Sequence, residues 1–595
     1  MSLTGTTSSQ CDVEVMGAPL NPLVFAKLVS AEVDSSLFLP SSFRLVFRDS
    51  PDQVLTLAGL QLAVEVQINV VSGAVPTMLL NGEVTSVEVD YGPDGALTVV
   101  RGMDKSHRLM RGTKTMAYPM TTASEAVTRI VAAAGLLPGA VLPTTTLYQW
   151  LTQANVSDWT FIQQLAALEN CVAYADQYGI FHFGPMPEPS AGLPPVMSAL
   201  EPPEGTQLAM GVNLVRLRAT VSSAEQVPAV TVTGYDPTMA MPVIGLSPGL
   251  PSTALSLDPA VLPVAVAGEF GAAPFFDASR PFDDMGAATT RAQSIAADIA
   301  GALAEMEGQC LGNADLLAGE SFSIGLAGMP FDGQYIASSA RHVFEPESGG
   351  YTTWFTVGGF QDRSLYSLAS GTAPSSANRP MLEGLVVGTV VDNVDEESQG
   401  RVKVMFPWLA PDYVSAWART VQIGAGKLGS GFLWLPEVGD EVLVGFDRGD
   451  IDHPYVLGNL YNGVAPPVPP PDIEGTVASR RIVSGRLHKI EFDDGPEALG
   501  ITIVTGTQTC SVKLDAEQQS VTVTALGEVS VQAGPEGVSI TSAGNLTLQA
   551  AGSVSIQGAS ISATAEGAAS LQGANLSLTG EAAVSVTSPS ISLGA

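Results

Sequence analysis

The stretch NLTLQAAGSVSIQG, residues 545–558, contains two pairs of aliphatic residues, and one polar residue separates the members of each pair. This alternation is typical of a β-strand with one buried face. Similar pairs recur about every eight residues between positions 521 and 593. No Phe, Tyr or Trp occurs in residues 493–595, so these short strands lack the large side chains of an ordinary core.

A strand with only two inward aliphatic side chains is unstable alone in water, so other strands must supply the remaining walls of a core. Either the chain winds on itself as a β-solenoid with three units per coil, or three chains intertwine and each provides one wall of a triangular prism. The short unit and the lack of a second period of about 24 residues favour the intertwined trimer. A low-complexity linker is a third reading, which the regular recurrence disfavours. The predicted core residues of this needle are Val529, Val531, Val538, Ile540, Leu546, Leu548, Val554, Ile556, Leu576, Leu578, Val584 and Val586.

The composition is that of an acidic, turn-rich β protein. Lys and Arg number 26 against 59 Asp and Glu, and the formal net charge is −33. Binding to nucleic acid or to anionic membranes needs clustered basic residues, so neither partner is expected. Only 14% of residues are charged, whereas Gly numbers 61 and Pro 41. This balance is typical of short strands joined by many turns.

Catalytic, metal and cofactor sites find little support in the sequence. The four cysteines are scattered, without a C-x-x-C pair or a Cys/His cluster. The five histidines are far apart, and no G-x-S-x-G nucleophile motif is present. The loop DRGDIDHP, residues 447–454, lacks the downstream glutamate of an EF-hand and is better read as a turn between strands. We therefore expect no enzyme activity, no cofactor and no metal.

Local patterns also predict individual helices. Thr122 and Glu125 fit a capping box, and Ser157 or Asp158 fits the N-cap of a second helix. A third helix is predicted from four apolar residues at helical spacing, Ile295, Ile299, Leu303 and Met306.

Strand patterns, turns and a proline-rich spacer divide the chain into six segments. The predicted fold class is mainly β with small α/β parts: β-barrel modules, an OB-fold barrel and a C-terminal triple-stranded intertwined β-helix. The segments are a first β-barrel module (1–105), an α/β insert (106–205), a second β-barrel module (206–375), the OB-fold barrel (381–463), a linker and neck (464–500) and the needle (501–595).

Three tryptophans fall in the predicted OB-fold barrel, Trp408, Trp417 and Trp434. Aromatic side chains on such barrels can stack on sugars or bases. Packing in the core or at a trimer interface is the favoured role here, because the surroundings are acidic.

The predicted OB-fold barrel also resembles a known family. The stretches GRVKVMFPW (400–408), SAWART (415–420) and GSGFLWLPEVGDEVLVGFDRGDIDHPYVLGNLYN (429–462) are very similar to the central barrel of VgrG-type spike proteins. That family serves contractile phage tails, type VI secretion and extracellular contractile injection systems. SDWTFIQQLA (157–166) and the strands of residues 333–357 resemble the hub of the same proteins.

The resemblance implies a homotrimer in which two hub β-barrel modules per chain present a pseudo-sixfold ring to the hexameric tail tube. Its other implied partners are baseplate proteins, a PAAR-like tip protein and effector cargo. The tip protein is expected to contact Pro589, Ile591, Leu593 and Ala595. No lysozyme-like insert or effector domain is visible, so enzymatic cargo on this chain is not expected.

The implied function is that of a structural spike and baseplate hub that links the tail tube to a membrane-piercing needle. No signal peptide is visible in MSLTGTTSSQ, so we expect synthesis in the cytoplasm and assembly into a phage-tail-like particle that can be released from the cell. The alternatives are a trimeric adhesin or carbohydrate-binding fibre, and a spike-borne hydrolase. The host machine, the target cell and the cargo stay open.

Overall fold

In the computed structural model, the chain divides into two compact units, Met1–Pro467 and Val468–Ala595. None of the helices in the described part of the chain is long and apolar enough to cross a membrane. The structure describes residues 9–72, 76–93, 95–190, 205–224, 226–236, 239, 241–248, 255–256, 263–269, 273–345, 350–358, 384–407, 409–410, 412–467, 475, 477–495 and 499–592.

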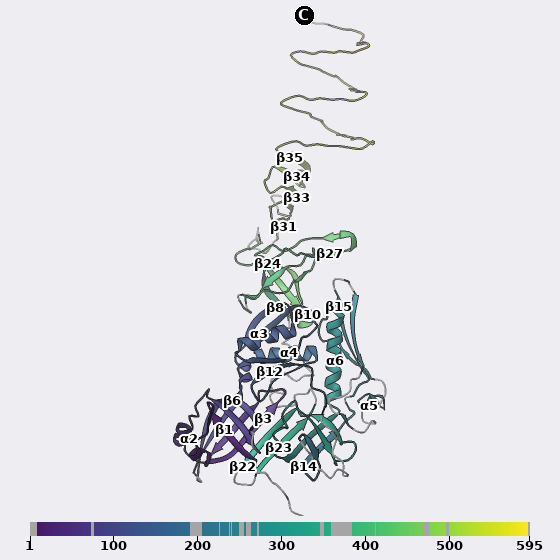
Figure 1. The fold of residues 1–595 in the computed structure, drawn as a ribbon. Coiled ribbons are helices and arrows are strands. Elements are labelled where there is room, and N and C mark those ends of the chain that lie inside the picture. The colour runs from purple at the N-terminus through teal and green to yellow at the C-terminus, as the bar shows by residue number, and fades with distance from the viewer. Residues whose placement is uncertain are drawn as a thin grey trace, which may run out of the picture. The chain divides into compact units, whose positions relative to one another are not determined.

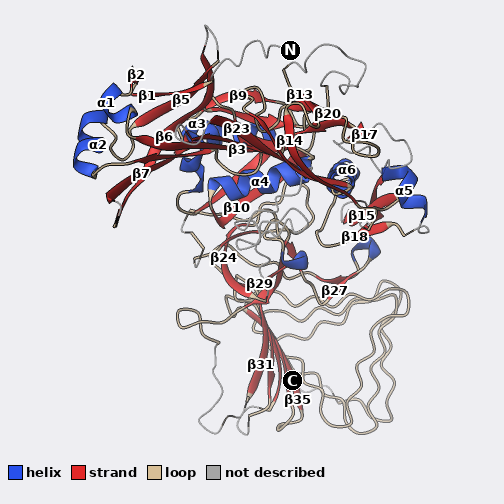
Figure 2. Ribbon diagram, turned by 90° about the horizontal axis from the view of Figure 1, so that it is seen from below, coloured by secondary structure: helices blue, strands red, loops and turns tan. Residues whose placement is uncertain are grey.

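An 11-stranded sheet is the largest element of the first unit (Figures 1 and 2). It joins strands from both predicted β-barrel modules, because β22 pairs antiparallel with β3, with Ser339 opposite Ser36. In spatial order its strands are β14 (Leu214–Val221), β19 (Ala304–Leu311), β23 (Gly350–Val357), β22 (Ser339–Glu345), β3 (Leu28–Ser36), β4 (Ser42–Phe47), β7 (Gly95–Asp104), β6 (Pro76–Gly92), β5 (Glu65–Val71), β1 (Gln10–Val15) and β2 (Ala18–Pro19).

Two apolar cores lie against this sheet. The first packs the inward residues of β1 and β3–β7 against the short helices α1 (Pro22–Phe25) and α2 (Pro51–Ala58). The second lies between the sheet and a four-stranded sheet, where Phe322 and Phe355 meet edge to face with ring centroids 4.8 Å apart. The strands of this smaller sheet are β13 (Gln207–Ala209), β20 (Ser321–Gly325), β21 (Gly333–Ile336) and β17 (Leu255–Ser256).

The α/β insert folds much as its local patterns predict. Thr122 and Glu125 form the expected capping box of α3 (Ala123–Ala133), and Ser157 caps α4 (Asp158–Glu169) by accepting a hydrogen bond from the Thr160 amide. One buried apolar cluster unites the two helices with the insert's strands. The other elements of the insert are η1 (Lys105–Met110), β8 (Lys114–Thr122), β9 (Leu137–Val141), β10 (Leu147–Val156), β11 (Val172–Ala175) and β12 (Ile180–Gly184).

The third predicted helix is correct in its first part and wrong in its second. Helix α6 (Met285–Gly301) contains Ile295 and Ile299, but Leu303 follows the helix and Met306 lies on β19. Residues 304–311 pair with both β14 and β23, and this tertiary pairing overrides the helical spacing. Helix α6 packs on a three-stranded sheet of β15 (Ala229–Asp236), β16 (Met241–Pro248) and β18 (Phe275–Asp277). A short helix, α5 (Pro263–Glu269), precedes β18 in the chain.

Residues 386–459 form the OB-type barrel, whose sheet has the order β25-β24-β29-β30-β26. The barrel closes where Val402 and Ala418 exchange two backbone hydrogen bonds of 2.9 and 2.7 Å. The loop of residues 447–454 connects β29 to β30, as predicted, and includes η4 (Asp447–Gly449). The other elements are β24 (Val386–Asp392), β25 (Lys403–Met405), β26 (Arg419–Thr420), β27 (Gly424–Ala425), η3 (Lys427–Gly429), β28 (Gly431–Phe432), β29 (Glu441–Phe446) and β30 (Pro454–Asn459).

The second unit begins with an antiparallel meander of five strands and continues as extended chain. Residues 526–592 contain no assigned strand, and their trace turns back and forth in Figure 1. The meander strands are β31 (Ser479–Val483), β32 (Lys489–Asp493), β33 (Gly500–Val504), β34 (Cys510–Asp515) and β35 (Ser520–Ala525).

Candidate functional site

The five-stranded meander, which we call the neck sheet, has one apolar face and one polar face. Residues opposite each other in antiparallel strands point to the same side of the sheet. Two cross-strand rows on the first face are therefore almost entirely apolar: Ile482–Ile490–Ile503–Val512–Val523 and Arg480–Phe492–Ile501–Leu514–Val521.

Charged pairs occupy the other face of the neck sheet. Glu491 forms ion pairs with Arg481 and, at 2.7 Å, with Lys489. Burial alone would raise the pKa of Glu491, but hydrogen bonds from Lys489, Ser479 and Arg481 hold it below its usual value. Lys513 pairs with Asp515 at 3.0 Å. This face is suited to water, whereas most side chains of the apolar face remain exposed among the described residues of the single chain.

The predicted needle core residues are all exposed in the single chain, with exposed fractions between 55% and 73%. None of the buried apolar clusters in the described part of the chain contains a residue of this segment. Of the predicted tip contacts, Pro589 and Ile591 are exposed, and Leu593 and Ala595 lie outside the described residues. The segment thus presents a continuous series of unpartnered aliphatic side chains.

The backbone of this segment makes few hydrogen bonds, and those that it makes are local. Within the described residues 527–592, the one backbone–backbone hydrogen bond joins the Gly537 amide to the Gly534 carbonyl at 3.0 Å. Backbone N–H and C=O groups that become buried must be paired. A segment that offers both bare aliphatic side chains and bare backbone groups can bury them only against other strands.

The OB-type barrel is fastened to the rest of the first unit by polar contacts. Thr152 of β10 and Tyr413 share a hydrogen bond of 3.0 Å between their hydroxyls. The buried carboxylate of Asp450 accepts a hydrogen bond of 3.2 Å from Arg280, whose carbonyl accepts one of 2.8 Å from Arg448. These contacts place the barrel firmly on the insert and on the segment that precedes α6.

The five histidines all have structural partners. His107 lies 3.3 Å from Glu83, His182 lies 3.0 Å from Asp176, and His453 lies 3.6 Å from Asp450. In the described part of the chain, no group of three or more His, Cys, Asp or Glu could hold a metal ion. Of the other two histidines, His342 is hydrogen-bonded to the Tyr351 hydroxyl at 2.8 Å, and His488 accepts a hydrogen bond of 3.1 Å from the Gly506 amide.

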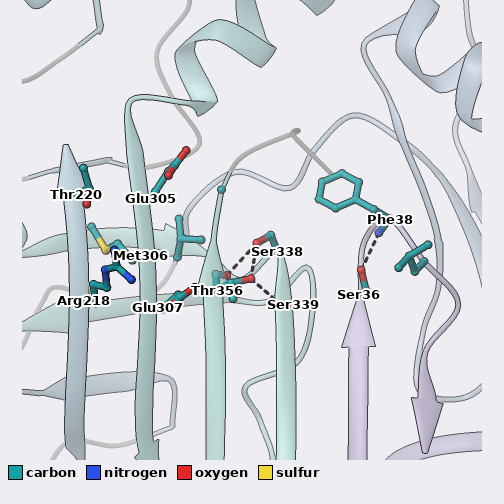
Figure 3. A pocket seen from close by; sticks show the side chains of 13 residues that line it. Ser36, Phe38, Arg218, Thr220, Glu305, Met306, Glu307, Ser338, Ser339 and Thr356 are labelled. Carbon is teal, nitrogen blue, oxygen red and sulfur yellow. Dashed lines mark hydrogen bonds between the residues drawn. The ribbon is translucent and has the colours of Figure 1, made fainter. Parts of the chain in front are cut away.

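A polar recess of about 460 Å³ lies over one end of the large sheet (Figure 3). One cross-strand row of polar residues forms much of its lining: Ser36, Ser339, Thr356, Glu307 and Arg218. The hydroxyl groups of Ser339 and Thr356 bond each other at 2.7 Å. The recess therefore offers hydrogen-bonding groups from five neighbouring strands.

The structure describes two of the three barrel tryptophans. Trp417 lies under the Lys403 ammonium, which is 4.7 Å from its ring centroid, and Trp434 stacks on Phe432 at 5.8 Å. Trp408 lies outside the described residues. Residues 464–500 were predicted as a linker and neck without strands, although the alternation in SRRIV (479–483) and KIEFD (489–493) is a strand signal.

Comparison with known proteins identifies the barrel. Residues 386–461 match the family described as the type VI secretion system/phage-baseplate injector OB domain. The chain is 34% identical over 132 residues to the type VI secretion system spike protein VgrG2a of Pseudomonas aeruginosa, a match to 20% of this chain and 16% of that protein. It is 36% identical over 97 residues to the actin cross-linking toxin VgrG1 of Vibrio cholerae, covering 15% of this chain and 9% of the toxin. The matched parts thus span less than a fifth of the length of these relatives.

Two solved structures resemble a larger part of the chain at low sequence identity. The lidded PdpA-VgrG complex of Francisella matches 88% of this chain and 81% of its own chain, with a TM-score of 0.50 at 9% identity. An E. coli type VI secretion component, c3393, matches 75% of this chain and 99% of its own, with a TM-score of 0.45 at 16% identity. The barrel of this chain therefore matches the injector OB domain of type VI secretion systems and phage baseplates, and the matched parts of the chain resemble VgrG spike proteins.

Proposed function

We propose that this chain is the structural spike and baseplate hub of a contractile injection machine, and that three copies form the working unit. The observation that carries the proposal is the tail of residues 527–592, in which the aliphatic pairs are exposed and few backbone groups are paired in the single chain. Three intertwined copies would cover both at once, because each copy supplies one wall of the core and one partner in the backbone ladder.

The neck sheet supports the same arrangement. Its apolar face carries Phe492 and eight aliphatic residues in two rows, too many for a stable surface exposed to water. Three such sheets with their apolar faces turned inward would form a prism whose outer faces carry the ion pairs of Glu491 and Lys513.

The mechanical function follows from this construction. Backbone hydrogen bonds around the whole perimeter resist bending, and an acidic, aromatic-free exterior limits adhesion to whatever the needle pierces. The hub binds the tail tube and baseplate proteins, and Pro589 and Ile591 contact a PAAR-like tip protein. The chain itself performs no catalysis, carries any effector as cargo, and works in an assembled particle.

Native mass spectrometry and electron microscopy of the purified full chain test the proposal. A trimer with a tapered end is expected, and a monomer would overturn the proposed assembly. A cell-wall and lipid hydrolysis assay addresses the enzymatic alternative. Turnover that a single substitution abolishes would contradict the assignment as a purely structural spike.

A further inference from the structure

A histidine lies where the OB-type barrel meets the rest of the first unit. His453 belongs to the loop between β29 and β30, and its side chain is 32% exposed. The Nδ1 atom of the ring is nevertheless buried, has no hydrogen-bond partner in the described part of the chain, and lies 3.6 Å from Oδ2 of Asp450. The ring can therefore exchange a proton with water, and the resulting charge lies beside a buried carboxylate.

Oδ2 of Asp450 also holds the barrel in place. This atom accepts a hydrogen bond of 3.2 Å from Arg280, which precedes α6. Arg448, in the same loop as His453, donates a hydrogen bond of 2.8 Å to the Arg280 carbonyl. We call His453, Asp450, Arg280 and Arg448 the barrel latch. Within it, a histidine of the barrel and an arginine from outside the barrel approach the same oxygen atom.

Carboxylates are in excess around the barrel latch. The charged groups near His453 are Asp447, Arg448, Asp450 and Asp452 from its own loop, and Arg280 and Asp283 from the segment that precedes α6. With a neutral His453, four carboxylates therefore surround two guanidinium groups, and a proton on the ring halves this excess of negative charge. Burial alone would lower the pKa of His453, but the adjacent Asp450 carboxylate and the charges of two further carboxylates raise it above 6.5.

We propose that the barrel latch is a pH-dependent joint between the OB-type barrel and the segment before α6, tight when His453 carries a proton and loose when the proton has left. In the tight state the imidazolium and the Arg280 guanidinium share the Asp450 carboxylate. In the loose state the excess negative charge of the loop repels Asp283 and weakens the contact.

The direction of the pH dependence follows from the same cluster. Because the pKa of His453 is higher in the folded chain than in the unfolded chain, the stabilisation is complete below pH 6.5 and is lost as the pH rises through the higher value. All groups of the barrel latch belong to one chain, so the inference does not depend on the proposed trimer.

Limited proteolysis of the full chain with trypsin tests the barrel latch at its own position. Trypsin cleaves after Lys and Arg, and Arg448 lies within the latch, whereas the exposed Lys427 lies in a different loop of the barrel. The ratio of cleavage at Arg448 to cleavage at Lys427 cancels the pH dependence of the protease itself. In the wild type this ratio should rise by about threefold or more as the pH is raised from about 6 to about 9.

Two substitutions fix the charge at position 453. His453→Arg keeps a positive charge throughout and should give a low ratio that does not change with pH; trypsin does not cleave at the new arginine because Pro454 follows it. His453→Gln is always neutral and should give a high ratio, equally independent of pH. If the glutamine variant does not fold, the comparison of the wild type with His453→Arg still decides the question.

The melting temperature of the full chain gives a second readout. The difference between the wild type and His453→Gln should be largest near pH 6 and should shrink toward pH 9. A ratio in the wild type that stays constant with pH, or that rises equally in His453→Arg, would overturn the barrel latch. Neither result bears on the proposed spike function, which the native mass of the full chain tests separately.

Discussion

Truncation of Leu546 to alanine gives the most direct measure of the needle core. Leu546 is 61% exposed in the single chain, and replacement of an exposed side chain usually changes the free energy of unfolding by no more than about 0.5 kcal/mol. If two other chains cover it, Leu546→Ala removes a core side chain and should cost about 2–5 kcal/mol per chain. Because the substitution occurs three times, the expected loss is about 6–15 kcal/mol per trimer.

Thr547 provides the matched control. It lies between Leu546 and Leu548 and therefore points to the opposite side of the extended chain. Thr547→Ala should leave the stability of the trimer within about 0.5 kcal/mol per chain of the wild type.

Denaturant unfolding at fixed protein concentration, with native mass recorded across the transition, compares the two variants. Fixed concentration matters because the stability of an oligomer depends on it. Leu546→Ala should shift the dissociation midpoint strongly and Thr547→Ala hardly at all. Equal, small shifts would refute the reasoning, because they would show that Leu546 stays in water in the assembled protein.

Further predictions concern the hub, the barrel contact and the neck sheet. Burial lowers the pKa of His342 from 6.5 to about 3, so the neutral histidine contributes to stability above pH 6.5. This contribution is lost as the pH falls from 6.5 toward 3. His342→Gln should therefore reduce the dependence of the free energy of unfolding on pH between these values. Arg280→Met leaves the buried Asp450 carboxylate without the Arg280 guanidinium and should lower the free energy of unfolding, measured by thermal unfolding, by about 3–5 kcal/mol. A second substitution, Asp450→Asn, removes the buried charge and should restore part of this loss. Ile503→Asp places a charge on the apolar face of the neck sheet and should abolish the native trimer, whereas Thr502→Asp on the polar face should preserve it.

Local signals in the sequence were sufficient for much of the fold. The capping box of Thr122 and Glu125 is complete within four residues, and the N-cap of Ser157 on the Thr160 amide is equally local. The barrel strands alternate clearly and have glycines at their bends, so the OB-type barrel was also predictable. The two helix caps depend on residues that are close neighbours in sequence, and the barrel strands were recognised from their local alternation.

Long-range pairing was harder to predict. The contact between β3 and β22 joins residues some 300 positions apart, and no local pattern indicates that the two β modules share a sheet. The end of α6 shows the same limit, because Met306 fits a helical stripe as well as it fits a strand. Neighbouring strands decide that choice, and a pattern of spacing contains no information about them.

For the candidate site, the sequence predicted which aliphatic residues belong to a core, and in the single chain these residues are exposed. The period of the tail identified its aliphatic pairs, and their exposure is the property of one wall taken from a larger core. The hairpin of β27 and β28 is not evident in the sequence, because GAGKLGSG (424–431) is rich in glycine and has no regular alternation of apolar and polar residues. Only the structure shows that this loop holds Leu428 outward in a left-handed conformation.

The neck sheet also supplies what the repeat of the tail lacks in the proposed trimer, a fixed register. Successive units of the tail present nearly the same side chains, as Leu546/Leu548 and Leu576/Leu578 illustrate. A slip of one unit between chains would therefore bury similar groups, and such strands specify their register weakly. In the neck sheet, by contrast, five strands pair within one chain, so each position has a defined partner, and Phe492 marks a single row. Because each unit of the tail follows directly from the one before it, alignment of three neck sheets fixes the alignment of every later unit.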